Sequence, residues 1–499
     1  CHSAKAKSVK GGLLLDSRNG WVSGGESGTA VVPGKPGESL LIEAVRYEGL
    51  EMPPKEKLTA NQVADLVRWV EMGAPDPRRG GTASLIRREI NIEEGRSFWA
   101  FQPPNAALLP DIENRKWPAS PIDHFILARI EAAGIAPVQD ADKTTLARRL
   151  YFDLIGLPPT PRQLEAFLAD VSPQAVEALV DTLLASPHFG QRWARHWLDI
   201  ARFAESTGME RNYTFPHAWM YRGYVIDAFN KDLPFDRFVR EQVAGDLIEA
   251  KSPEERNRLK IATGFLAMGP KSLNQRNKAI FRMDIVDEQI DITTRAIMGL
   301  TVSCARCHDH KFDPFPTEDY YALAGIFSST RTYFGTAVSP ANRVAGDPLP
   351  LPRMDGLKIF HRSIPAKRVA ALKAELAGMQ KEKDKGMAAV RKAIAQGRDP
   401  TGIFTLRDAL RIFWRSGAIE GQLEKVDESG NAIPLAMGTL DRDTVGDSPL
   451  LERGDVALPA KLVPRGFPEV IKIDESFAIE GDQSGRLQLA RWLTHRKHP

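Results

Sequence analysis

Apolar residues recur at helical spacing through the centre of this chain. Between residues 119 and 335, amphipathic runs follow one another and few stretches alternate with period two, a pattern typical of an all-α domain. Several runs open with a helix-capping residue followed by proline, which favours the first helical turn: Ser120, Thr160, Ser172 and Ser252. The pattern predicts helices over residues 121–133, 143–155, 161–169, 173–185, 188–205, 216–230, 234–248, 253–268, 279–305 and 317–328.

The regions on either side of this helical stretch have other patterns. Residues 1–80 begin with a glycine-rich stretch and then predict two helices, one over 39–45 and one that opens at Thr59. Residues 81–118 carry few periodic signals and predict a linker. Residues 336–355 predict a connector, and Ala366 to about Ala395 a charged helix of a helical hairpin or short coiled-coil insertion. Four later pieces predict strands: 411–415, 435–440, 449–454 and 461–467.

These patterns indicate a mainly α fold. We expect a small helical domain, a larger all-α domain, a helical insertion and a minor β-rich C-terminal region. The corresponding boundaries are residues 1–80, a linker at 81–118, the helical domain at 119–335, the connector and hairpin at 336–410, and 411–499 for the β-rich segment and the start of a truncated C-terminal domain. The length of 499 residues agrees with two to four domains.

Composition excludes some functional classes. The content of 42% hydrophobic and 26% charged residues is that of a globular protein with a sizeable core. The formal net charge of +3 argues against a dedicated nucleic-acid-binding protein. No apolar run is long enough to suggest a transmembrane segment.

The three cysteines supply the most specific motif. Cys304-Ala-Arg-Cys307-His308 has the C-x-x-C-H spacing of covalently attached c-type haem. In such a site the two thiols bond to the porphyrin vinyl groups, and the histidine is the proximal iron ligand. If the segment is helical, the three side chains share one face. Two alternatives stay open: a zinc site completed by histidines such as His310, and a plain dithiol.

The chain begins with Cys1-His2, which we interpret as the end of another such motif in a fragment whose export signal lies upstream. About fifty residues later Met52 precedes two prolines, which fix the backbone so that a thioether can be held as a distal ligand. Met52 as an ordinary core residue is the alternative. The sequence thus predicts a first haem held by Cys1, His2 and Met52.

These segments resemble the planctomycete-type cytochrome c domain, which precedes domains of unknown function in large exported proteins. The residues that carry the resemblance to that domain are Cys1-His2, Val32–Leu41, Met52-Pro53-Pro54 and Leu66–Pro75. Those that resemble the next domain are 120–123, 154–160, 193–199, 227–230, 234–236, 241–246 and 304–314. The resemblance implies haem c, with two sites in the full-length protein, and a location in the periplasm or at the cell surface.

The distal ligand of the second haem is harder to identify. His196 is the first candidate because it lies on a predicted helix beside an apolar stripe of Trp193, Trp197, Ile200 and Ala204. Rival candidates are His188, His217, Met209 and Met283, and an open sixth position would suggest catalysis. His310 is too close to His308 to reach the opposite side of the iron and is expected to hydrogen-bond locally.

An acidic stripe precedes the motif on the predicted helix 279–305. It consists of Asp284, Asp287, Glu288 and Asp291. Such a stripe is usually solvated or paired with arginine; a carboxylate-lined cleft near the haem is the sharper alternative.

The leading hypothesis is an exported cytochrome that transfers electrons between a redox partner protein or a small-molecule donor and an acceptor. A haem-dependent oxidoreductase acting on an extracytoplasmic organic substrate is the alternative. A third possibility is a non-enzymatic surface protein with a zinc-binding motif. A His/Met-ligated iron has a higher potential than a bis-His iron, so we expect the N-terminal site to be the electron-accepting end.

Overall fold

The computed structural model describes residues 2–3, 9–54, 56–78, 90–336, 346–354, 357, 359, 361–473 and 475–499. The chain separates into two compact units, Cys1–Ile90 and Asn91–Pro499. The predicted boundaries at residues 118, 335 and 410 lie within the second unit. In the described part of the chain, no helix is long and apolar enough to cross a membrane.

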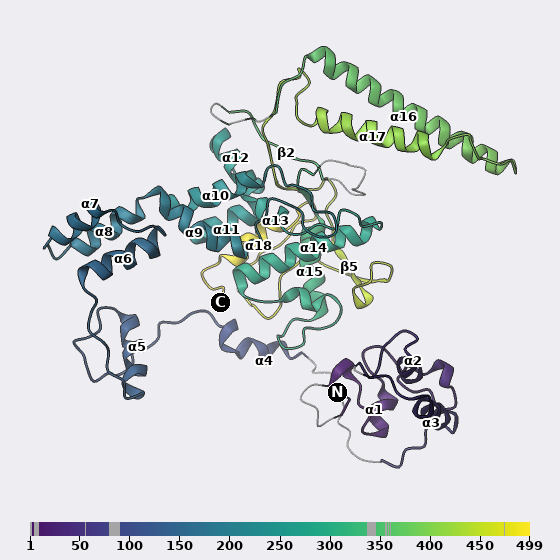
Figure 1. Cartoon of the computed structure of the whole chain (residues 1–499), viewed down its shortest axis with the longest axis horizontal. Helices are drawn as coiled ribbons and strands as arrows, with labels where there is room; N and C mark the ends of the chain where they lie inside the picture. Colours follow the sequence, from purple (N-terminus) through teal and green to yellow (C-terminus); the bar gives the residue numbers. More distant parts are fainter. Residues whose placement is uncertain are drawn as a thin grey trace. The chain divides into compact units, whose positions relative to one another are not determined.

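The first unit is a small helical body. Its elements are η1 (Lys10–Gly12), α1 (Arg18–Ser23), η2 (Pro36–Glu38), α2 (Leu40–Arg46) and α3 (Ala60–Glu71) (Figure 1). The predicted helix start at Thr59 is confirmed, because the Thr59 hydroxyl accepts a hydrogen bond from Gln62 N–H in a capping box. The core is short: Trp21, Ala30, Val31, Ile42, Val70 and Ala74.

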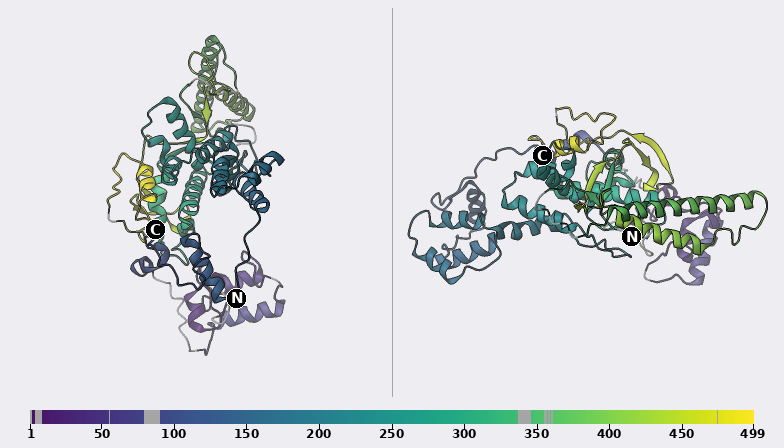
Figure 2. Two further views of the ribbon diagram at one scale, coloured as in Figure 1. Left: turned by 90° about the vertical axis from the view of Figure 1, so that its left-hand side faces the viewer. Right: turned by 90° about the horizontal axis from the view of Figure 1, so that it is seen from above.

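The second unit holds most of the helices. They are α4 (Ile92–Ser97), η3 (Trp99–Phe101), α5 (Pro121–Ala132), α6 (Lys143–Leu154), α7 (Pro161–Ala169), α8 (Ala175–Leu184), α9 (Pro187–Ile200), α10 (Ala218–Asn230), α11 (Phe235–Ala244), η4 (Gly245–Leu247), α12 (Pro253–Ala262), α13 (Gly264–Ala267), α14 (Lys278–Thr293), the π-helical turn η5 (Thr294–Met298), η6 (Val302–Arg306), α15 (Thr317–Ser328), α16 (Ala366–Ala395), α17 (Leu406–Leu423), η7 (Glu452–Gly454) and α18 (Arg486–Leu493). Helices α16 and α17 pack side by side as a hairpin (Figures 1 and 2).

One hydrophobic core extends through this unit from Phe101 to Leu493. Its largest fully buried side chains include Tyr221, Phe265 and Phe315. Helix α18 is tied to it by the fully buried Arg486, whose guanidinium bonds to Asp246 at 2.7 Å and Asp441 at 2.5 Å. Such a buried charge is tolerated because carboxylates surround it.

Short antiparallel strands complete the second unit. They are β1 (Thr330–Tyr333) with β4 (Gly438–Asp441), β2 (Leu349–Pro350) with β3 (Leu435–Ala436), and β5 (Ser448–Leu451) with β6 (Pro459–Val463). The predicted mainly α fold with minor β structure near the C-terminus is confirmed.

Three local predictions are wrong. The helix predicted over 279–305 ends at Thr293, continues as a π-helical turn to Met298 and stops at Gly299, which adopts left-handed φ of 68°. Residues 411–415 lie in α17 rather than in a strand, because Ile412 packs into the hairpin core against α16. The region predicted as all-α contains β1, since its pairing partner β4 lies about a hundred residues later in the chain.

Candidate functional site

The Cys304–His308 motif begins in the short 3₁₀ helix η6 and continues past its end at Arg306, so it does not lie at the end of a long α-helix. Cys304 lies within this helix, and Cys307 is the residue at which it ends. Val302 and Ala305 on the other side are fully buried, whereas both thiols are free and exposed. The motif therefore presents its sulfurs outward from a firmly packed base.

His308 is also exposed, and its ring orientation is fixed. Its Nδ1 lies 2.7 Å from the carbonyl oxygen of Asp309. A carbonyl can only accept, so Nδ1 carries the proton and Nε2 keeps its lone pair for a metal. This is the tautomer that a proximal haem ligand requires.

Two hydrogen bonds and one close glycine contact support the motif from neighbouring elements. The Tyr321 hydroxyl of α15 donates to the Arg306 carbonyl oxygen at 2.9 Å. The Ser303 hydroxyl donates to Asp291 of α14 at 2.8 Å. Gly454, before β6, is so close that a Cβ atom there would lie 2.8 Å from the Cys307 sulfur. These contacts leave the opposite, solvent-facing side of the thiols for a cofactor.

His310 has a structural role and is 8% exposed. Its Nδ1 accepts the Asp313 N–H at 2.8 Å, so Nε2 carries the proton and donates to the Thr301 hydroxyl at 3.1 Å. The imidazole is therefore neutral, and its 3.4 Å contact with the Asp313 carboxylate is no charged pair. With both ring nitrogens engaged, His310 is poorly placed to complete a zinc site with the two thiols.

Asp309 holds the start of α15. One of its carboxylate oxygens accepts hydrogen bonds from Thr317 N–H at 3.0 Å and the Thr317 hydroxyl at 3.1 Å. Sequence reasoning missed this cap because Asp309 lies eight residues before its partner, outside the usual N-cap position. The residues that follow His308 thus lock the motif to the helix beneath it.

The acidic stripe on α14 is paired with arginines. Arg306 lies 3.6 Å from Asp284 and 3.5 Å from Asp287, and Arg295 lies 3.1 Å from Asp291. Glu288 pairs with Arg202. Burial raises the pKa of Asp287 and Glu288 above the usual range, and the arginines oppose that shift. This geometry agrees with the expectation that the acidic stripe is paired with arginine.

The first predicted site is described in part. Cys1 lies outside the described residues. The Nδ1 atom of His2 lies 3.3 Å from the Leu13 carbonyl oxygen, which again leaves Nε2 with its lone pair. Met52 is 38% exposed and its N–H donates to the Ala44 carbonyl oxygen at 3.0 Å, so it is no core residue. Both side chains fit a cofactor that would cover them, and their roles stay predictions.

The predicted apolar stripe beside His196 is wrong. The buried side of α9 is Ala194, Trp197 and Leu198, because α9 packs against α10 and Trp197 Nε1 donates to Tyr221 at 3.0 Å. His196 is exposed, with its ring centroid 5.4 Å from that of Trp193. Its assignment as the distal ligand stays a prediction.

The rival distal ligands lie in unlike surroundings. His188 contacts Gln191 at 3.0 Å, Met209 is 60% exposed, Met283 is buried, and His217 lines a separate cavity.

Two family models match the chain. Residues 1–56 match the family described as Planctomycete cytochrome C, and residues 121–332 match the family described as Protein of unknown function (DUF1549). No curated protein and no solved structure matches the chain. The first match covers His2 and Met52, and the second covers the Cys304–His308 motif.

Proposed function

Since the chain carries a planctomycete cytochrome c domain followed by a DUF1549 domain, we propose that it belongs to an exported cytochrome with two covalent haems that transfers electrons. At the first site Cys1 is an anchor, His2 the proximal ligand and Met52 the distal ligand. At the second, the thioether anchors are Cys304 and Cys307, and His308 is the proximal ligand. Bound haem supplies a one-electron redox centre.

The observation that carries the second site is the combination of two free, exposed thiols with an oriented imidazole. Cys304 and Cys307 are accessible to the machinery that attaches haem. The Nδ1–H of His308 is committed to the Asp309 carbonyl, which selects Nε2 for the iron. Both features support haem attachment at this motif.

Location and partner follow from the chemistry of attachment. Haem is bonded to C-x-x-C-H motifs outside the cytoplasm, so we propose the periplasm or the cell surface. The electron source is then a redox protein or a small-molecule donor in that compartment. His196 remains our first candidate for the distal ligand of the second haem.

A potentiometric titration of the holoprotein tests the electron-transfer proposal. We expect two transitions, with the higher potential at the His2/Met52 site, because a thioether ligand favours ferrous iron. Met52→Ala should lower or abolish the high-potential transition. Met72→Ala is the matched control, since Met72 is exposed in the same unit at 62%. The proposal is contradicted if the two-haem protein shows a single transition. It is also contradicted if Met52→Ala leaves the high-potential transition unchanged.

A further inference from the structure

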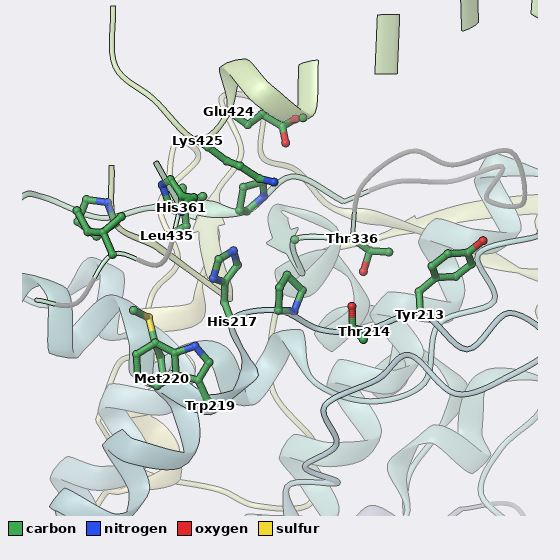
Figure 3. A pocket seen from close by; sticks show the side chains of 16 residues that line it. Tyr213, Thr214, His217, Trp219, Met220, Thr336, His361, Glu424, Lys425 and Leu435 are labelled. Carbon is green, nitrogen blue, oxygen red and sulfur yellow. The ribbon is translucent and has the colours of Figure 1, made fainter. Parts of the chain in front are cut away.

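The second unit contains a cavity of about 420 Å³ that the proposed function does not use. Its lining comes from several segments distant in sequence, and none of the lining residues belongs to the Cys304–His308 motif. In Figure 3, Glu424 and Lys425 reach it from the end of α17, and Trp219 and Met220 from the start of α10. His217 lies between these two groups. The volume is within the range of small-molecule sites.

Two polar atoms at this cavity are buried without a partner among the described residues. One is the hydroxyl of Thr336, a residue that is 3% exposed. The other is Nε2 of His361. An unmade hydrogen bond on a buried group costs about 1–3 kcal/mol, so such groups are usually satisfied by a ligand or water. Both residues line the same cavity, which points to a polar occupant there.

The charged groups of the cavity favour an anion. Lys425 is an exposed residue of the lining and supplies a positive charge. Burial lowers the pKa of His217 to about 4, with His361 and Lys425 adding to the effect, so His217 is neutral near pH 7. Burial, Asp347 and Glu420 raise the pKa of Glu424 to about 7, against the opposing effect of Lys425. Near and below neutral pH the lining is therefore neutral or positive.

The remaining wall is apolar. Trp219, Met220 and Leu435 line it together with prolines. Trp219 is 36% exposed and contributes to the lining of the cavity. An inorganic anion would leave this wall unused, and a cation would be repelled by Lys425.

We propose that the cavity binds a small carboxylic acid with a flat apolar body. The carboxylate meets Lys425 and the unpartnered Thr336 and His361 groups, and the apolar body lies against Trp219 and Met220. When Glu424 is protonated it donates a further hydrogen bond to the ligand, and when ionised it repels it. Affinity should therefore rise as the pH falls from 8 to 6.

Benzoate is a suitable probe, with benzamide as its uncharged analogue and acetate as its analogue without the ring. Calorimetry and ligand-observed NMR on the holoprotein should show benzoate binding more tightly than either. Lys425→Gln should weaken benzoate about fivefold, the value of an exposed charge contact. Lys373→Gln is the matched control, since Lys373 is an exposed lysine that pairs with Glu428 outside the cavity.

Two further variants separate binding from structure. Thr336→Val should weaken benzoate while keeping the fold, because the hydroxyl has no partner among the described residues of the protein. Glu424→Gln should bind benzoate at pH 8 as tightly as the unaltered protein does at pH 6. The proposal is overturned if benzoate fails to bind at millimolar concentration, if benzamide binds equally well, or if Lys425→Gln and Lys373→Gln behave alike. Persistence of the pH dependence in Glu424→Gln overturns the role of Glu424.

Discussion

His2 and His308 have the same hydrogen-bonding geometry in very different surroundings. Each places Nδ1 near a backbone carbonyl, at 3.3 Å and 2.7 Å respectively, and leaves Nε2 for a metal. His2 belongs to a unit whose hydrophobic cluster contains six buried side chains among the described residues. His308 follows a 3₁₀ helix whose base, Val302 and Ala305, belongs to the large core of the second unit.

The two candidate sites therefore differ in how much of the surrounding protein supports them. A haem held by His2 and Met52 would add apolar contact to a unit this small. At the second site Tyr321, Ser303 and Asp309 already hold the motif through hydrogen bonds. Removing the haem should therefore affect the two units unequally.

The largest expected effect follows from producing the protein without haem attachment. We expect the first unit to lose its fold, because haem contributes to its core, while the second unit stays folded. Hydrogen exchange should show unprotected amides in α2 and α3 and native protection in α14 and α15. Equal protection of both units in the haem-free protein contradicts the comparison, and so does unfolding of both.

Asp319 is a buried carboxyl group on α15 and should make the stability of the second unit depend on pH. Burial raises its pKa to about 7, although Glu469 N–H bonds to the carboxylate at 3.2 Å. Between the ordinary aspartate pKa of 3.8 and a pH of about 7, the Asp319 carboxyl group is therefore protonated in the folded protein and ionised in the unfolded chain. Stability should fall by about 4 kcal/mol between pH 4 and pH 7 and then level off.

Denaturant titrations across this pH range measure the effect. In the Asp319→Asn variant, stability should no longer fall between pH 4 and pH 7. Above pH 7 the variant should be more stable than the unaltered protein. Glu318→Gln serves as the control, since Glu318 is exposed and pairs with Lys461. An unchanged slope in Asp319→Asn would show that Asp319 ionises normally in the folded state.

Gly454 packs closely against the sulfur of Cys307, and a larger residue there should disturb the motif. Alanine there would place Cβ 2.8 Å from the Cys307 sulfur and adopt an unfavourable φ of 74°. We expect a loss of about 2 kcal/mol in stability and less haem attached at the second motif. Gly446→Ala is the control, because a Cβ at Gly446 meets no atom of the described residues within 4 Å. Equal haem content in the two variants would rule out close support by Gly454.

The smallest effect is expected at Thr301. Thr301→Val removes the acceptor of the His310 Nε2–H bond and should cost about 1 kcal/mol. Thermal unfolding measures the loss, and faster exchange of the His310 ring proton in NMR spectra accompanies it. A fully stable Thr301→Val protein would mean that His310 is held by its Nδ1 contacts alone.

The sequence predicted elements with local signals better than those set by tertiary contacts. Helices α7 and α12 begin at their predicted prolines, Pro161 and Pro253, since the preceding threonine and serine cap them. The break at Gly299 was missed because apolar residues continue at helical spacing on both sides of it. Residues 411–415 have strand propensity, but packing against α16 overrides it.

The same contrast between local signals and tertiary contacts applies to the candidate site. The spacing of Cys304, Cys307 and His308 identified the motif because its chemistry is local in sequence. The contact of Gly454 with Cys307 and the cavity around Glu424 join residues more than a hundred positions apart, so no local pattern reveals them.

Whether haem is bonded to Cys304 and Cys307 is the central question, and peptide mass spectrometry of the protein made with haem-attachment machinery answers it most directly. We predict that the peptide with both thiols carries haem and that Cys304→Ala with Cys307→Ala abolishes this species. Lys311→Ala, which alters an exposed residue just after the motif, should leave it intact. Recovery of that peptide with free thiols, or of protein with zinc bound there, contradicts the account.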